Sequence, residues 1–195
     1  MAETQTRLDF IEGYFRTLVD VIAQLPRAEL ARALEVLETA WAERRRVFIA
    51  GNGGSAATAS HMANDLMKGV AKGGAVGVRA IALSDNVALI TAIANDEDYR
   101  EIFAGQLDML AEPGDVLIAI TGSGNSPNVV RAVESARRLG VHTIGFLGMS
   151  GGQVGKMVDV AVVVPSDDYG PIEDLHMVFD HLMTAYLRRW AGGAR

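Results

Sequence analysis

The chain has 195 residues, enough for one α/β domain with a full hydrophobic core and too few for two comfortable ones. Hydrophobic residues make up 49%, which excludes a disordered chain, and the apolar runs are too short to span a membrane. The net charge of −6 argues against a protein that coats nucleic acid. The absence of cysteine excludes disulfides and thiolate catalysis, and Met1 is not followed by a secretory signal pattern, so we expect a cytoplasmic protein.

The first part of the chain is predicted to be helical. Apolar positions recur at helical spacing over about 8–25 and 27–44, and Pro26 separates the two segments. Both helices precede the first strand, so residues 1–45 are expected to form an added helical layer or a contact between subunits.

Strands and helices then alternate through residues 46–195. Strands are predicted near 47–50, 78–83, 116–120, 142–147 and 160–164, and helices near 54–69, 86–94, 98–111, 127–139, 151–157 and 171–190. The strands are nearly continuous apolar runs, which is typical of a parallel sheet covered on both faces. The pattern therefore predicts one α/β domain, a three-layer sandwich around a five-stranded parallel sheet.

Two strand-to-helix turns are rich in glycine and hydroxyl groups. One is Gly51-Asn52-Gly53-Gly54-Ser55, and the other is Thr121-Gly122-Ser123-Gly124-Asn125-Ser126. Neither turn is a Walker loop, and neither fits a dinucleotide-binding motif. The glycines alone would make tight turns and the hydroxyls would cap helices. Four hydroxyl positions over two turns instead favour a phosphorylated small molecule, because helix N-termini attract anions.

Two groups of titratable residues lie on helices. His61 and Asp65 are four residues apart, which puts them on one face near the first turn, where they are either a surface pair or a metal-ligand or acid–base pair. The last helix carries Glu173, Asp174, His176, Asp180 and His181. Its first acidic residues are typical complements of the helix dipole, whereas histidines in an apolar helix are expected to have specific partners.

These motifs resemble the sugar isomerase (SIS) domain family and, within it, the phosphoheptose isomerases, over essentially the whole chain. The matching segments are the two Gly/Ser turns, Ser60-His61-Met62-Ala63, Ala94-Asn95-Asp96 and the histidine pair of the last helix. The resemblance implies a flavodoxin-like strand order and the conversion of sedoheptulose 7-phosphate to D-glycero-D-manno-heptose 7-phosphate through an enediol.

The resemblance also implies the roles of individual residues. The phosphate and sugar would be bound by Asn52, Gly53, Ser55, Asp96, Thr121, Gly122, Ser123, Ser126 and Glu173. Asp65 and His181 would be the catalytic base and acid. A zinc ion would be held by His61, Asp65, Glu173 and His181.

This chain departs from the family at three of these positions. Asp65 replaces the usual Glu, and Glu173 replaces the usual Gln. Gly69 takes the place of a basic residue, for which the neighbouring Lys68 is a candidate substitute. These differences suggest a divergent subgroup. A non-catalytic SIS phosphosugar-binding protein, such as the one that associates with the bacterial replication initiator, is the alternative, and His181 favours the enzyme.

The spacing of the last-helix residues bears on assembly. Glu173 and His181 are eight residues apart, so they are separated by about 12 Å along a continuous helix. Ligands of one zinc ion each lie within about 2.2 Å of it. We therefore expect a homotetramer, as the family resemblance implies, with active sites at subunit interfaces.

Overall fold

The structure is a computed structural model that describes residues 2–71 and 76–191. Its centre is a parallel sheet of five strands in the order β2-β1-β3-β4-β5, which confirms the predicted sheet and its flavodoxin-like order. The strands are β1 (Arg46–Gly51), β2 (Arg79–Ala82), β3 (Val116–Thr121), β4 (His142–Leu147) and β5 (Val160–Val163). In the register, Val47 pairs with Ala80 on one side and with Val116 on the other.

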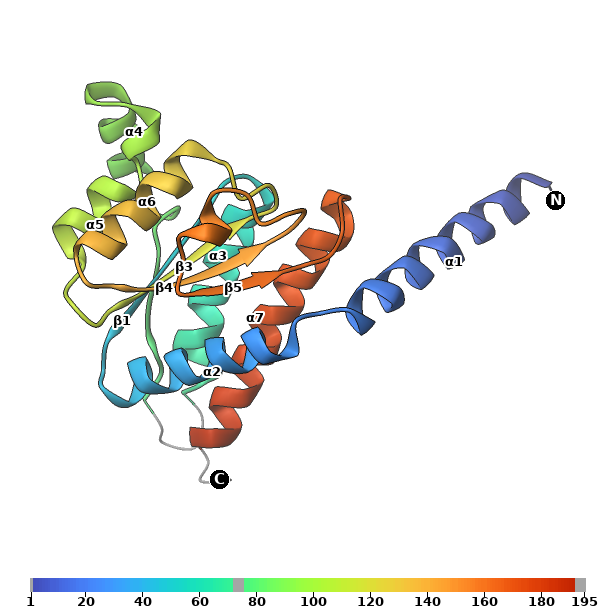
Figure 1. The fold of residues 1–195 in the computed structure, drawn as a ribbon, viewed down its shortest axis with the longest axis horizontal. Helices are drawn as coiled ribbons and strands as arrows, with labels where there is room; N and C mark the ends of the chain where they lie inside the picture. The colour runs from blue at the N-terminus through green and yellow to red at the C-terminus, as the bar shows by residue number, and fades with distance from the viewer. Residues whose placement is uncertain (1, 72–75, 192–195) are drawn as a thin grey trace.

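Helices cover both faces of the sheet, as the nearly continuous apolar strands predict (Figure 1). One hydrophobic cluster joins the sheet to α2 (Arg27–Ala42), α3 (Gly54–Asn64) and α7 (Tyr169–Ala191). A second cluster joins the opposite face to α4 (Val87–Asp96), α5 (Ala104–Leu110) and α6 (Pro127–Arg138). These clusters form the core of the three-layer arrangement.

Three predicted helices differ from the observed ones. The helix expected over 98–111 breaks into a 3₁₀ turn, η2 (Tyr99–Glu101), and α5, while the helix expected over 151–157 shrinks to the 3₁₀ turn η3 (Val154–Lys156). The helix expected over 54–69 ends its regular part at Asn64 and continues as a π turn, η1 (Asp65–Gly69). Single π turns often occur at functional sites.

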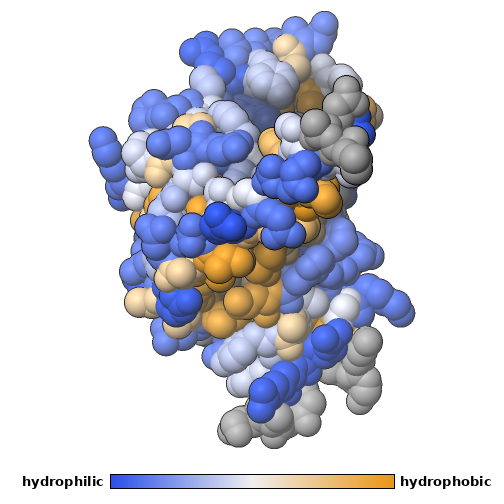
Figure 2. Space-filling view, turned by 90° about the vertical axis from the view of Figure 1, so that its right-hand side faces the viewer, coloured by the Kyte–Doolittle hydropathy of each residue, from blue (hydrophilic) through white to orange (hydrophobic). Residues whose placement is uncertain are grey.

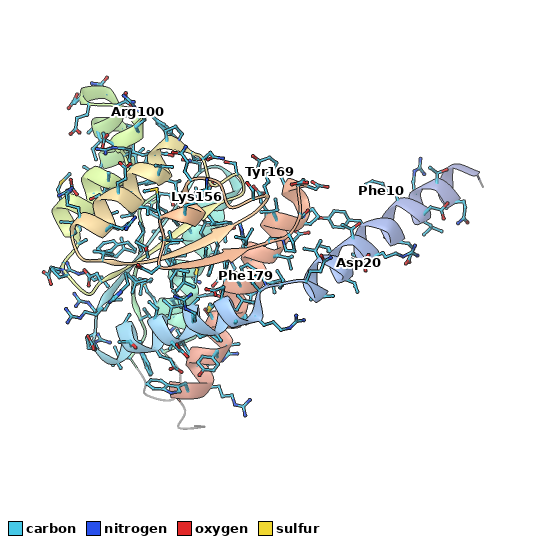
Figure 3. The ribbon with its side chains drawn as sticks, in the orientation of Figure 1. Phe10, Asp20, Arg100, Lys156, Tyr169 and Phe179 are labelled. Carbon is cyan, nitrogen blue, oxygen red and sulfur yellow. The ribbon has the colours of Figure 1, made fainter. Side chains whose placement is uncertain are left out.

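Helix α1 (Ala2–Ala23) extends away from the rest of the molecule (Figure 1). Phe10 lies on its outer part, with no other element of the chain beside it (Figure 3), and is 74% exposed. Tyr14 attaches the helix to α7 by donating a hydrogen bond of 2.5 Å to Asp174. Figure 2 looks at the side from which α1 projects and shows a hydrophobic patch across its middle.

Apolar residues form a stripe along α1. They recur with the alternating spacing of three and four residues that is typical of helices packed in bundles, at Leu8, Ile11, Phe15, Leu18 and Ile22. All of these side chains except the half-buried Leu18 are exposed. Among the described residues, none of the helices has the length and hydropathy needed to cross a membrane.

Candidate active site

The two Gly/Ser turns lie side by side, because β1 and β3 are neighbours in the sheet and each turn follows the carboxyl end of its strand. Gly53 has a φ of 56°, a left-handed conformation that favours glycine, and its carbonyl accepts hydrogen bonds from Ala56 and Ala57 at the start of α3. Pro127 occupies the first turn of α6, which begins directly after the second Gly/Ser turn.

A pocket of about 180 Å³ lies between the two turns. Its lining consists of Asn52, Ser55, Ile120, Thr121, Gly122, Ser123, Ser126, Tyr169 and Glu173. Most of the residues expected to bind substrate are therefore brought together. Gly53 shapes the turn without lining the pocket, and Asp96 lies outside it, exposed at the end of α4.

Two residues of this region escaped the sequence prediction. Tyr169, which Figure 3 labels at the start of α7, lines the pocket; it follows the loop after β5, whose sequence gives no sign of this position. Asn128 is buried in the first turn of α6 and exchanges two side-chain hydrogen bonds of 2.8 Å with Asn52. This amide pair joins the two turns and holds the walls of the pocket together.

The pocket is suited to bind an anion, and the groups that would donate hydrogen bonds to it are neutral. Among the residues that the structure describes, no lysine or arginine lines it, so hydroxyl groups and the N-termini of α3 and α6 are the donors. Glu173 approaches the start of α3 so closely that a Cβ on Gly54 would lie 2.5 Å from its Oε2. A carboxylate is favourable at a helix N-terminus, which is the place that a phosphate would also occupy.

A second group of side chains lies further along α3 and α7, which pack against each other. His61, Asp65, Asp180 and His181 offer ligand atoms that all lie within 4.8 Å of one another. The Nε2 atom of His61 is 3.3 Å from Nε2 of His181 and 3.5 Å from Oδ2 of Asp65. It is also 3.8 Å from Oδ2 of Asp180.

The separations within this His/Asp cluster fit a divalent metal ion such as zinc. Zinc binds imidazole nitrogen and carboxylate oxygen at about 2.0–2.2 Å, so neighbouring ligand atoms of a tetrahedral site are about 3.3–3.6 Å apart. The two imidazole nitrogens of His61 and His181 match this spacing at 3.3 Å. Two nitrogens that face each other so closely need a shared proton or a cation between them.

The expected ligand set differs from the observed cluster at one residue. Glu173 lies outside the cluster, in the phosphate pocket, and Asp180 takes a place beside the histidines. The reason is the rise of α7, which separates Glu173 from His181 by about 12 Å along the axis of one chain. Asp180 is on the buried face of the helix with 0% exposure, and burial together with the charge of Asp65 raises its pKa to about 6.

His176 lies one helical turn before Asp180 and is not part of the cluster. It is 1% exposed between Phe146 and Phe179, and neither of its ring nitrogens makes a hydrogen bond of normal geometry. Burial lowers the pKa of His176 to about 4, and the Leu147 backbone offsets only part of this effect. His176 is therefore a neutral residue of the core.

Acid is expected to destabilise the protein through His176. Its pKa is lower in the folded chain than the ordinary 6.5, so neutral His176 contributes fully to the free energy of unfolding above pH 6.5. This free energy falls by about 3 kcal/mol as the pH drops from 6.5 toward 4. In His176→Leu, the free energy of unfolding should fall less between pH 7 and pH 4 than it does in the parent. Urea unfolding of both proteins at the two pH values, with chelator present, measures this difference. The exposed His142→Leu variant is the control, and an unchanged pH dependence in His176→Leu would contradict the prediction.

Comparisons with known proteins agree with this geometry. The SIS domain family matches residues 10–148. The phosphoheptose isomerase of Geotalea daltonii is 37% identical over 178 residues, which cover 91% of this chain and 92% of that protein. The structure of a phosphoheptose isomerase from Francisella tularensis superimposes with a TM-score of 0.88 at 31% identity, covering 94% of this chain and 98% of that one. The phosphoheptose isomerase of Neisseria gonorrhoeae gives a TM-score of 0.85 at 28% identity, covering 92% and 97% of the two chains.

The family match covers more than half of the chain, and the relatives match it over nearly their whole length. The aligned segments include both Gly/Ser turns and the strands that position them. The chain therefore belongs to the SIS domain family, in which it groups with the phosphoheptose isomerases.

Proposed function

We propose that the protein converts sedoheptulose 7-phosphate to D-glycero-D-manno-heptose 7-phosphate. The observation that carries the proposal is that α3 and α7, which pack together at the cluster of carboxylate and imidazole groups, also contribute residues to the hydroxyl-lined anion pocket. The pocket would bind the phosphate, and the cluster has the groups for moving protons between neighbouring carbons. The names of the relatives point to the same seven-carbon substrate.

The reaction needs two proton transfers, for which the cluster has suitable groups. Asp65 would remove a proton from C1 of the ketose and return it to C2, while His181 would give a proton to the oxygen on C2 and accept one from the oxygen on C1. An enediol lies between the two steps. A carboxylate suits the carbon-bound proton, and imidazole, which titrates near neutrality, suits the oxygens.

We propose that the cluster holds zinc through His61 and His181 together with a carboxylate of the cluster. Bound there, zinc would polarise the substrate carbonyl as a Lewis acid, in place of proton donation by His181. Glu173 would then act on the substrate from the phosphate pocket, rather than as a ligand within its own chain.

A homotetramer with active sites at subunit interfaces is the proposed assembly. The apolar stripe of α1 supports it, because this stripe has the spacing of a helix-bundle seam and is mostly exposed in the single chain. The side of the cluster where His61 and His181 are exposed leaves room for a neighbouring subunit to complete the site. We further propose that the chain acts as one domain in the cytoplasm.

Incubation with sedoheptulose 7-phosphate tests the proposed activity. NMR should show the aldose phosphate appearing, with solvent deuterium incorporated at the carbon that exchanges its proton through the enediol. Binding without turnover, in the presence of added zinc, would instead support a non-catalytic phosphosugar-binding protein.

The carboxylate of Glu173 is expected to weaken phosphate binding, because it lies in the pocket that receives a dianion. Glu173→Gln should bind sedoheptulose 7-phosphate about fivefold more tightly, since the repulsion between two unit charges about 4 Å apart in water is about 1 kcal/mol. Calorimetric titration measures the change, and the neighbouring Asp174→Asn variant is the control for a lost charge on the same helix. Weaker binding by Glu173→Gln would show instead that the Glu173 carboxylate accepts a hydrogen bond from the sugar or orders a contact.

A further inference from the structure

Asp180 is a buried acid without an adequate partner. Its side chain is 0% exposed. Among the described residues, its Oδ2 has no hydrogen-bond partner, and Oδ1 has only a long contact of 3.5 Å from the Thr184 hydroxyl. Burying an unpaired carboxylate is costly unless it is paired or coordinates a cation. The unpartnered Oδ2 faces His61 at 3.8 Å, on the inner side of the His/Asp cluster.

The two carboxylates of the cluster differ in their surroundings. The Asp65 side chain is 26% exposed, and its Oδ1 accepts a hydrogen bond from Asn64, so it can be solvated. It lies on the π turn at the end of α3, where the helix is irregular. Asp180 lies in the middle of α7, where its side chain is fully buried.

From this difference we infer that Asp180, with His61 and His181, forms the fixed ligand set of a divalent-cation site in one chain. Two imidazoles and one carboxylate are a common protein set for catalytic zinc, which keeps a further position open. Asp65, on the solvent side, is then available for proton transfer. Asp180 also makes the distant Glu173 unnecessary as a ligand. The inference rests on the metal site of the proposed function, but not on the sugar that the enzyme converts.

Zinc affinity is the direct measurement. Asp180→Asn, which keeps the shape of the side chain, is expected to weaken zinc binding at least a hundredfold in competition with a chromophoric chelator. Asp65→Asn should change the affinity less than tenfold, and Glu173→Gln should leave it unchanged. Asp174→Asn, an acid on the same helix outside the cluster, is the control for loss of one negative charge.

Stability without metal provides a second readout. A carboxylate that serves to bind a cation does not stabilise the fold when the cation is absent. Asp180→Asn and Asp180→Ala should therefore both fold in the presence of chelator, with a Tm at or above that of the parent. Added zinc should raise the Tm of the parent and not that of these variants. Zinc affinity within threefold of the parent in both variants would overturn the inference, and so would failure of both to fold.

The outcomes separate this inference from the proposed reaction. If zinc binding depends on Asp180 but no heptose phosphate is converted, the ligand assignment stands and the proposed reaction fails. If the parent converts the sugar phosphate but binds no zinc, the proposed reaction stands and the ligand assignment fails.

Discussion

Asp65→Asn and His181→Ala are each expected to lower turnover of sedoheptulose 7-phosphate by more than about a hundredfold, the usual contribution of a general acid or base. The fold should tolerate both changes, because His181 is exposed and Asp65 is only half-buried at a helix end. Sugar-phosphate affinity should change much less than kcat, since neither residue lines the phosphate pocket. Steady-state kinetics with NMR detection of the aldose measures both quantities.

Three controls accompany these variants. Asp20→Asn on α1 and His142→Ala at the start of β4 remove the same chemical groups from exposed positions and should keep full activity. A mixture of Asp65→Asn and His181→Ala chains, dissociated and reassembled, should stay inactive, because both residues belong to the cluster of one chain. Substantial activity in either single variant would contradict the assigned acid and base, and recovery in the mixture would contradict the single-chain cluster.

The sheet and the phosphate pocket could be predicted from the sequence because their signals are local. Each strand is an apolar run, and each Gly/Ser turn directly follows such a run, so the topology of a parallel sheet is enough to bring the two turns together. The Asn52–Asn128 pair could not be predicted, since its geometry depends on how closely the two turns approach.

The composition of the His/Asp cluster depends on tertiary packing. His61 and Asp65 share a helix face, which their spacing of four residues already predicts. Asp180 joins them only because α7 turns that side toward α3 and the core, and a single acid among apolar residues does not reveal this orientation. Glu173 was expected in the cluster from the family resemblance, and the rise of an unbroken helix places it in the pocket instead. The π turn at Asp65 likewise has no clear sequence signal.

Placing charge on the apolar stripe of α1 is expected to break the assembly. In the parent, light scattering at micromolar concentration should give four times the chain mass of 20.8 kDa. The double variant Ile11→Glu with Phe15→Glu puts two carboxylates in the centre of the stripe, where both side chains are exposed in the single chain and would be buried between helices in the tetramer. The variant should therefore dissociate into smaller species at the same concentration.

The matched control is Arg16→Glu, which adds a glutamate to the exposed, polar side of the same helix and should leave the tetramer intact. Far-ultraviolet circular dichroism distinguishes dissociation from unfolding, because the core formed by the sheet with α2, α3 and α7 does not depend on the exposed stripe. If a neighbouring chain completes each active site, turnover should fall with dissociation, while zinc affinity, which depends on groups of one chain, remains. A monomeric parent, or a double variant that stays tetrameric, would contradict the role of α1. A dissociated variant with full turnover would instead place every group that the reaction needs within a single chain.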